Sequence, residues 1–290
     1  MRTRRDSASD EKHSDLSPSK YQQHMPEATP PPDADLPVWT FRETLIGVVF
    51  TLVPWLALAT YALLGPASSA KPATTQPAAP TLDVINGILT FVVQALLEGT
   101  FLIAPLWYAV FKPRHLARQQ GLPEPDWREG WRALGLRSFS PWQAAAALTV
   151  GILAIFVASY LYAAIAQALR ITVQTNVDQL QARAASAPWT TLTTLIVAVI
   201  VAPFCEEIFF RGFFFQGLRL RLSLWLAVLL SAVIFGLAHG SPGSLALLIV
   251  IGLLLAIVRW RTRSLWPGML LHMFNNFLGA LIIFQALNFH

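Results

Sequence analysis

The chain is poor in charged residues and in cysteine. Asp, Glu, Lys and Arg together make up 13% of its 290 residues, whereas hydrophobic residues make up 54%. Soluble domains carry about 25% charged residues, so this composition indicates a polytopic membrane protein. The single cysteine, Cys205, excludes an intrachain disulfide and a multi-cysteine metal cage. The net charge of +5 is modest and gives no indication of nucleic-acid binding.

Several familiar signatures are absent as well. Residues 1–37 contain no short apolar stretch with a cleavage site, so no signal peptide is predicted there. They mix both charge signs with Ser, Pro and Gln, and we expect a disordered tail. The chain has no H-E-x-x-H, the local signature of zinc proteases. Its G-S-P-G run at 240–243 is not the G-x-S-x-G of a serine nucleophile, and Cys205 is expected to be a small buried hydrophobe.

Long hydrophobic stretches follow this tail. A membrane-spanning helix needs about 20 apolar residues. Segments of roughly this length are 43–64, 84–111, 141–168, 190–217, 222–239, 244–260 and 265–286. We predict an all-α fold, a polytopic membrane helix bundle of about seven transmembrane helices with the functional core in the last four. The predicted regions are the tail (1–37), the N-terminal helices and loops (38–189) and the core (190–286).

Basic residues are concentrated in alternate connectors. The connectors after the second, fourth and sixth spans are rich in arginine, whereas the others hold only Lys71, Arg170 and Arg183. The positive-inside rule predicts that the arginine-rich connectors and the N-terminal tail face the cytoplasm. Seven spans would place the C-terminus on the opposite side, and a re-entrant segment or an eighth span would reverse that placement.

Two adjacent glutamates within an apolar stretch are the most informative feature that is present. Between residues 190 and 215 the only charged residues are Glu206, Glu207 and Arg211. A charge at bilayer depth costs about 2.5–3.5 kcal/mol or more, and such residues are usually functional. Consecutive helical residues point about 100° apart, so the two acids have different roles. Glu207 precedes Arg211 by four residues, which favours a helical ion pair, and Glu206 needs a partner from another span.

Two later spans supply candidate partners. His239 ends the fifth span, and His272 and Asn276 share one face of the seventh. A carboxylate beside a histidine can take a proton from water, and an imidazole with an amide can stabilise an oxyanion. Glu206, His239 and His272 could equally hold a zinc ion that activates the water. The residues allow both schemes, so the cofactor is open; Asn276 beside His272 favours the metal-independent one slightly.

The order of these residues resembles a known family. Three motifs occur in sequence: E-E-x-x-x-R at 206–211, F-x-x-x-H at 235–239 and H-x-x-x-N at 272–276. Together they are similar to the motifs of the type II CAAX prenyl endopeptidase and bacteriocin-processing (CPBP, Abi) family of intramembrane proteases. The resemblance covers about one third of the chain, and its specificity comes from the three motifs lying in separate hydrophobic spans.

The resemblance implies an intramembrane endopeptidase that acts on a peptide or a membrane protein within the lipid bilayer. Glu206 and His239 would activate the water, and His272 and Asn276 would bind the oxyanion. The implied supporting residues are Glu207 and Arg211. The Ala- and Pro-rich tail indicates a bacterial protein, and hence the bacterial plasma membrane.

Other interpretations stay open at this point. Taken alone, Glu206 is compatible with a hydrogen bond between helices, His239 with a helix end at the headgroups, and His272 with packing. Asn275, one position off the motif, is expected to have no special role. The alternative function is a non-catalytic membrane scaffold or bacteriocin-immunity-type protein of the same fold. A proton-coupled transporter is not supported, because the sequence lacks the internal repeats and paired broken helices typical of that class.

The predicted depths of the two histidines conflict. At 1.5 Å per residue, His239 would lie about 25 Å from the cytoplasmic face and His272 only about 10 Å from it. Polar groups in hydrocarbon must find partners, and we predict that the four motif side chains line one cavity, within about 8 Å of one another. Either the seventh span begins deeper, with Pro267 as its first helical residue, or the fifth begins before Ser223.

Overall fold

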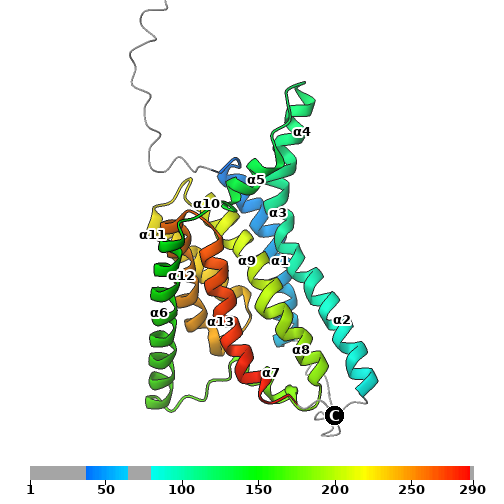
Figure 1. The fold of residues 1–290 in the computed structure, drawn as a ribbon, viewed down its shortest axis with the longest axis vertical. Coiled ribbons are helices and arrows are strands. Elements are labelled where there is room, and N and C mark those ends of the chain that lie inside the picture. Colours follow the sequence, from blue (N-terminus) through cyan, green and yellow to red (C-terminus); the bar gives the residue numbers. More distant parts are fainter. Residues whose placement is uncertain (1–36, 65–79, 288–290) are drawn as a thin grey trace, which may run out of the picture. The chain divides into compact units, whose positions relative to one another are not determined.

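The computed structural model describes residues 37–64 and 80–287, and every regular element in this part of the chain is a helix (Figure 1). The predicted all-α fold is therefore confirmed. Residues 1–36 of the predicted tail and the loop around Lys71 lie outside the described residues.

Most of the helices follow one another along the chain with only short connecting segments between them. They are α1 (Phe41–Leu64), α2 (Pro80–Gly99), α3 (Ile103–Leu106), α4 (Lys112–Gln119), α5 (Trp127–Leu134), α6 (Pro141–Ala168), α7 (Asn176–Ala184), α8 (Pro188–Ile196), α9 (Ala202–Glu207), α10 (Phe215–Leu218), α11 (Leu224–Ala238), α12 (Leu245–Thr262) and α13 (Trp266–Phe284). Short 3₁₀ turns are η2 (Thr100–Leu102) and η6 (Pro242–Ser244), and π-helical turns are η3 (Trp107–Phe111), η4 (Val197–Val201) and η5 (Ile208–Phe214).

Within the described residues, five helical stretches are long and apolar enough to cross a membrane, which makes the chain an integral membrane protein. They are Thr81–Gln119, Pro141–Ala168, Pro188–Leu218, Pro242–Thr262 and Trp266–Phe284. Helix α11 is apolar but has only 15 residues. Helix α1 has 24 residues, and several side chains near its end lie outside the description. The predicted count of seven is not confirmed.

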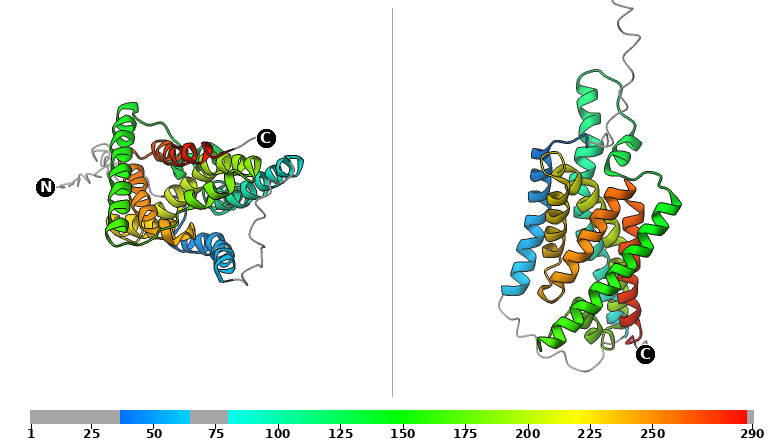
Figure 2. Two further views of the ribbon diagram at one scale, coloured as in Figure 1. Left: turned by 90° about the horizontal axis from the view of Figure 1, so that it is seen from below. Right: turned by 90° about the vertical axis from the view of Figure 1, so that its left-hand side faces the viewer.

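The stretch Pro188–Leu218 forms the centre of the bundle. It comprises α8, η4, α9, η5 and α10, and these contact α1, α2, α11, α12 and α13. Every residue from Cys205 to Leu218 is buried, including the charged Glu206, Glu207 and Arg211. Helix α6 lies across α12 and α13 on one side of this centre (Figure 2).

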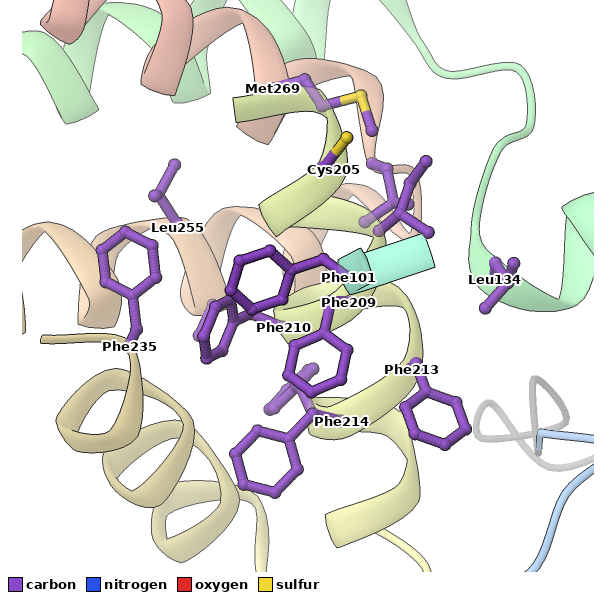
Figure 3. Close-up of a cluster of buried hydrophobic side chains, with 14 of the residues drawn as sticks. Phe101, Leu134, Cys205, Phe209, Phe210, Phe213, Phe214, Phe235, Leu255 and Met269 are labelled. Carbon is purple, nitrogen blue, oxygen red and sulfur yellow. The ribbon is translucent and has the colours of Figure 1, made fainter. Parts of the chain in front are cut away.

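Phenylalanine side chains fill the core around η5. The rings of Phe209 and Phe210 lie 5.1 Å apart at 89°, and Phe210 meets Phe235 of α11 at 5.3 Å, again edge to face. Phe101 of η2 contacts both Phe209 and Phe210 (Figure 3). Edge-to-face pairs add about 0.5–1.5 kcal/mol each beyond the area they bury. This aromatic packing fixes α2 and α11 against the helix that carries the glutamates.

The turn that leads into α13 lies inside the protein. In this turn Ser264 and Leu265 are both 0% exposed, and the Leu265 N–H donates to the carbonyl of Gly135 at 2.9 Å. Pro267 lies in the first turn of the helix, where its missing N–H costs nothing. Helix α13 thus begins inside the protein rather than at its surface, and His239 and His272 both reach Oε2 of Glu206, at 3.9 Å and 3.8 Å.

A carboxylate from α2 caps α8. Asp83 is 3% exposed and accepts hydrogen bonds from the backbone N–H groups of Trp189 (2.8 Å) and Thr190 (3.2 Å) and from the Thr190 hydroxyl (2.7 Å). The residue at the N-cap position of α8, Ala187, has no side chain that can cap. The first N–H groups of a helix need acceptors and favour negative charge. Asp83 therefore ties α2 to the helix that leads into the glutamates.

Candidate active site

The two glutamates lie in a short α-helical piece between two π-helical turns. Helix α9 follows η4 and precedes η5, and π turns inside helices occur frequently at functional sites. In η4 the N–H of Ala202 bonds the carbonyl of Val197, five residues back. In the same register the carbonyl of Ala198 would need a donor from Pro203, which has no N–H. The Asn276 side-chain amide donates to this Ala198 carbonyl at 2.8 Å, so the irregular backbone anchors a predicted site residue.

Glu206 faces both predicted histidines. Its Oε2 atom lies 3.9 Å from Nε2 of His239 and 3.8 Å from Nε2 of His272. The residue is 8% exposed, and Oε2 is buried without a hydrogen-bond partner among the described residues. A separation of this size between polar atoms leaves room for a bridging water. The structure thus brings together three side chains that are up to 66 positions apart in sequence.

The Nδ1 atom of each imidazole makes a hydrogen bond that orients the ring, while Nε2 faces Glu206. His239 Nδ1 lies 2.8 Å from the backbone carbonyl of Phe235, and His272 Nδ1 lies 3.2 Å from Oε1 of Glu207. Both partners can only accept, so Nδ1 carries the hydrogen in each ring. In the neutral form of each imidazole, Nε2 is an acceptor that faces Glu206.

Glu207 and Arg211 form a buried ion pair. The Arg211 Nη1 to Glu207 Oε1 distance is 2.9 Å, and both residues are 0% exposed. Arg211 also donates to the carbonyl of Gly252 at 3.3 Å, and its guanidinium lies 4.2 Å from the centre of the Phe235 ring. The same Oε1 atom of Glu207 holds the ion pair and the hydrogen bond from His272. Glu207 therefore links the buried charge to one of the imidazoles.

All four predicted motif residues line one cavity of about 790 Å³. They are Glu206, His239, His272 and Asn276. The rest of the wall is mainly apolar and comes from α2, α6, α8, α12 and α13. A cavity of about 300–1,000 Å³ with a few convergent polar groups is typical of binding sites for small ligands.

Asn275 contributes to the site although the motif omits it. Its side-chain amide donates to Oδ1 of Asn276 at 3.1 Å, and it lines the same cavity. With Oδ1 held by Asn275 and one Nδ2 hydrogen held by Ala198, the Asn276 amide has one hydrogen left for a ligand. Sequence spacing alone gave no sign of this role, since it depends on the rotamers of two neighbouring amides.

A second acidic residue, besides Glu206, lies in the cavity wall. Glu98, near the end of α2, lines the cavity and interacts electrostatically with Glu206. Its Oε2 atom is buried without a hydrogen-bond partner among the described residues. Glu98 is the only charged residue between positions 84 and 111, so the cost argument applied to Glu206 would have identified it.

The donor types for zinc are present, but their spacing does not fit. Zinc ligands at about 2.0–2.1 Å in a tetrahedron lie about 3.4 Å from one another. Glu206 Oε2 is 3.9 Å and 3.8 Å from the Nε2 atoms of His239 and His272. No group of three or more His, Cys, Asp or Glu side chains in the described part of the chain is arranged to hold a metal ion.

The comparisons with known proteins agree with the motifs. Residues 188–278 match the sequence model of the family described as "Type II CAAX prenyl endopeptidase Rce1-like". The chain is 35% identical over 82 residues to the "Putative membrane peptidase YdiL" of Bacillus subtilis, covering 28% of this chain and 34% of that protein. It is also 35% identical over 95 residues to an "Uncharacterized 24.3 kDa protein" of Escherichia coli, covering 31% of this chain and 44% of that one.

These matches cover only part of each curated relative. The chain spans between a third and a half of the length of the curated relatives it matches. No solved structure matches it significantly. The matched segment contains all three motifs, so the predicted resemblance is confirmed. Residues 188–278 of this integral membrane protein are similar to the Rce1-like type II CAAX prenyl endopeptidases.

Proposed function

We propose that the chain is an intramembrane endopeptidase that hydrolyses a peptide bond with a water molecule activated by Glu206 and His239. The observation that carries this proposal is the buried, unpartnered Oε2 of Glu206, faced at 3.8–3.9 Å by two oriented imidazoles. The similarity of residues 188–278 to a family of membrane proteases supports it. A water bound between Glu206 and His239 would be positioned for general-base catalysis.

The proposed reaction begins with this water. Glu206 takes a proton from it while the oxygen attacks the peptide carbonyl, which gives a tetrahedral intermediate. The carbon–nitrogen bond then breaks, and the proton held by Glu206 passes to the leaving amine. His239 accepts a hydrogen bond at Nε2 and keeps the water on the line of attack, because its Nδ1 hydrogen is held by the Phe235 carbonyl.

The oxyanion would be bound from the opposite wall. Asn276 offers its remaining amide hydrogen, and His272 offers Nε2. Since Nδ1 of His272 already donates to Glu207, His272 can donate from Nε2 only when doubly protonated. Glu207 is placed to stabilise that imidazolium. Donors fixed in advance around a developing negative charge are worth about 10²–10³ in rate each.

We propose the substrate and the orientation in the membrane as well. The substrate would be a peptide or membrane protein within the lipid bilayer, and the arginine-rich connectors and N-terminus would face the cytoplasm of a bacterial cell. Both curated relatives are bacterial proteins, which supports this setting.

The proposal is tested by cleavage of a quenched fluorescent membrane peptide by purified protein in lipid. We expect Glu206→Gln to lower the turnover rate at least about 100-fold. The exposed Glu129→Gln, a matched control on α5, should leave turnover unchanged. Wild-type turnover by folded Glu206→Gln would show that Glu206 is not the base, whereas no turnover by folded wild-type protein would favour the non-catalytic scaffold. Stoichiometric zinc in active protein, lost in Glu206→Gln, would replace the metal-independent scheme.

A further inference from the structure

The cavity contains acidic groups without a basic side chain to balance them. Among its described lining residues are the carboxyls of Glu98 and Glu206, and no Lys or Arg. Arg211 is fully buried beside Glu207, to which it is paired, and does not line the cavity. The other polar lining groups are mainly amides, hydroxyls and the two imidazoles, in a wall that is otherwise apolar.

Glu98 is half-buried, and one of its two carboxyl oxygens has no hydrogen-bond partner among the described residues. Its Oε2 atom is buried and lacks a hydrogen-bond donor among the described residues, as does Oε2 of the more than nine-tenths buried Glu206. A buried carboxylate that is neither paired nor hydrogen-bonded is strongly unfavourable. Buried polar atoms without partners in a native protein therefore need an explanation, and here both atoms belong to residues of the same cavity.

The backbone around Glu98 is held firmly. Glu98 precedes the switch from α2 to the 3₁₀ turn η2. Thr100, two residues on, accepts a hydrogen bond from the Trp55 indole at 3.0 Å and donates to the carbonyl of Leu97 at 2.6 Å. At the other end of α2, Asp83 caps α8. Glu98 is thus presented to the cavity by a helix fixed at both ends, as a recognition residue requires.

We propose that Glu98 is a specificity-determining residue that binds a cationic side chain, Lys or Arg, of the peptide beside the bond that Glu206 attacks. This inference rests on the proposed endopeptidase function. A Lys or Arg side chain suits the cavity because its long aliphatic stem can lie along the apolar wall while its charged end meets the carboxylate. The cation would supply the hydrogen-bond donors that Oε2 of Glu98 lacks.

The test uses a panel of quenched membrane peptides that are identical except at one position near the cleaved bond, which holds Lys, Met or Glu. The position is scanned over three residues on either side of that bond. At one position we expect wild-type protein to cleave the Lys peptide about tenfold or more faster in kcat/KM than the Met peptide. Glu98→Gln should bring this ratio close to one, and because the ratio compares two peptides in the same variant, a change in rate common to both peptides cancels.

Two further variants and a control sharpen the result. Glu98→Asp keeps the charge and should keep the preference for Lys, and Glu98→Lys should reverse it in favour of Glu. Gln94→Asn, one helical turn earlier in the same cavity wall, should retain the wild-type ratio. A wild-type enzyme without preference for Lys at any position, or a preference that survives in Glu98→Gln, overturns this inference alone. No cleavage of any peptide by folded wild-type protein overturns the proposed function as well.

Discussion

Glu207 holds together more of the candidate site than any other single residue. One of its oxygens, Oε1, forms the ion pair with Arg211 (2.9 Å) and accepts a hydrogen bond from His272 (3.2 Å). Arg211 in turn reaches the carbonyl of Gly252 on α12. Because Glu207 contacts α13 directly and α12 through Arg211, it affects stability and geometry together.

Replacing Glu207 should therefore reduce the folded yield as well as the activity. Glu207→Ala leaves Arg211 buried with only a carbonyl and aromatic rings as partners, and breaking a buried pair costs about 3–5 kcal/mol. We expect lower expression of monodisperse protein and a lower unfolding temperature in detergent. Glu129→Ala, at an exposed position, should match the wild type. If Glu207→Ala accumulates normally, unfolds at the wild-type temperature and loses only turnover, its supporting role is wrong.

At the scale of elements, sequence reasoning found the residues but not the supports that position them. Glu206, His239 and His272 stand out because polar groups are rare in apolar spans. Asp83 was missed because the backbone N–H groups that donate to its carboxylate are more than a hundred residues away. The Ala198 carbonyl was missed because a π turn cannot be read from hydrophobic periodicity. The predicted span 222–239 corresponds to α11, which has only 15 residues, so the count of seven is not confirmed.

The π turn before α9 predicts that Pro203→Ala affects stability and turnover in opposite directions. Pro203→Ala supplies an N–H that can bond the carbonyl of Ala198 or Val199, and it removes a proline from a helix, where proline costs about 3 kcal/mol. The unfolding temperature should stay the same or rise. Where the new N–H bonds Ala198, it competes with the Asn276 amide for that carbonyl, so we expect turnover to fall up to about tenfold.

A matched proline separates the two effects. Pro141→Ala lies in the first turn of α6, where proline is well tolerated, and it should change neither quantity. Wild-type turnover by Pro203→Ala would show that the bond between Asn276 and Ala198 is not needed for catalysis.

At the scale of the whole molecule, the described chain has a basic end and an opposite end. Helices α4 and α5 lie at one end and α7 at the other (Figure 1). The last residues of α12 lie at the basic end too, because Arg137 donates to the carbonyl of Arg263 at 2.7 Å. The positive-inside rule then assigns the end with α4 and α5 to the cytoplasm.

Cysteine labelling in intact cells tests this orientation. The single native cysteine, Cys205, is 4% exposed and should give little background. Gln120→Cys, after α4, and Ala185→Cys, after α7, replace exposed residues. We expect a membrane-impermeant maleimide added outside the cell to label Ala185→Cys only, and Gln120→Cys to react after the membrane is opened. The reverse pattern would invert the proposed topology.

The buried ion pair also bears on how the chain enters the membrane during translation. Arg211 is synthesised forty-one residues before the Gly252 carbonyl that accepts its hydrogen bond, and Glu207 sixty-five residues before His272. An arginine in the middle of an inserting helix costs about 2.5–3.5 kcal/mol on the translocon scale. The ion pair between Glu207 and Arg211 lies within the single stretch Pro188–Leu218, so it can neutralise the arginine before α12 and α13 emerge from the ribosome. The hydrogen bonds to Gly252 and from His272 can form only once those two helices have been made.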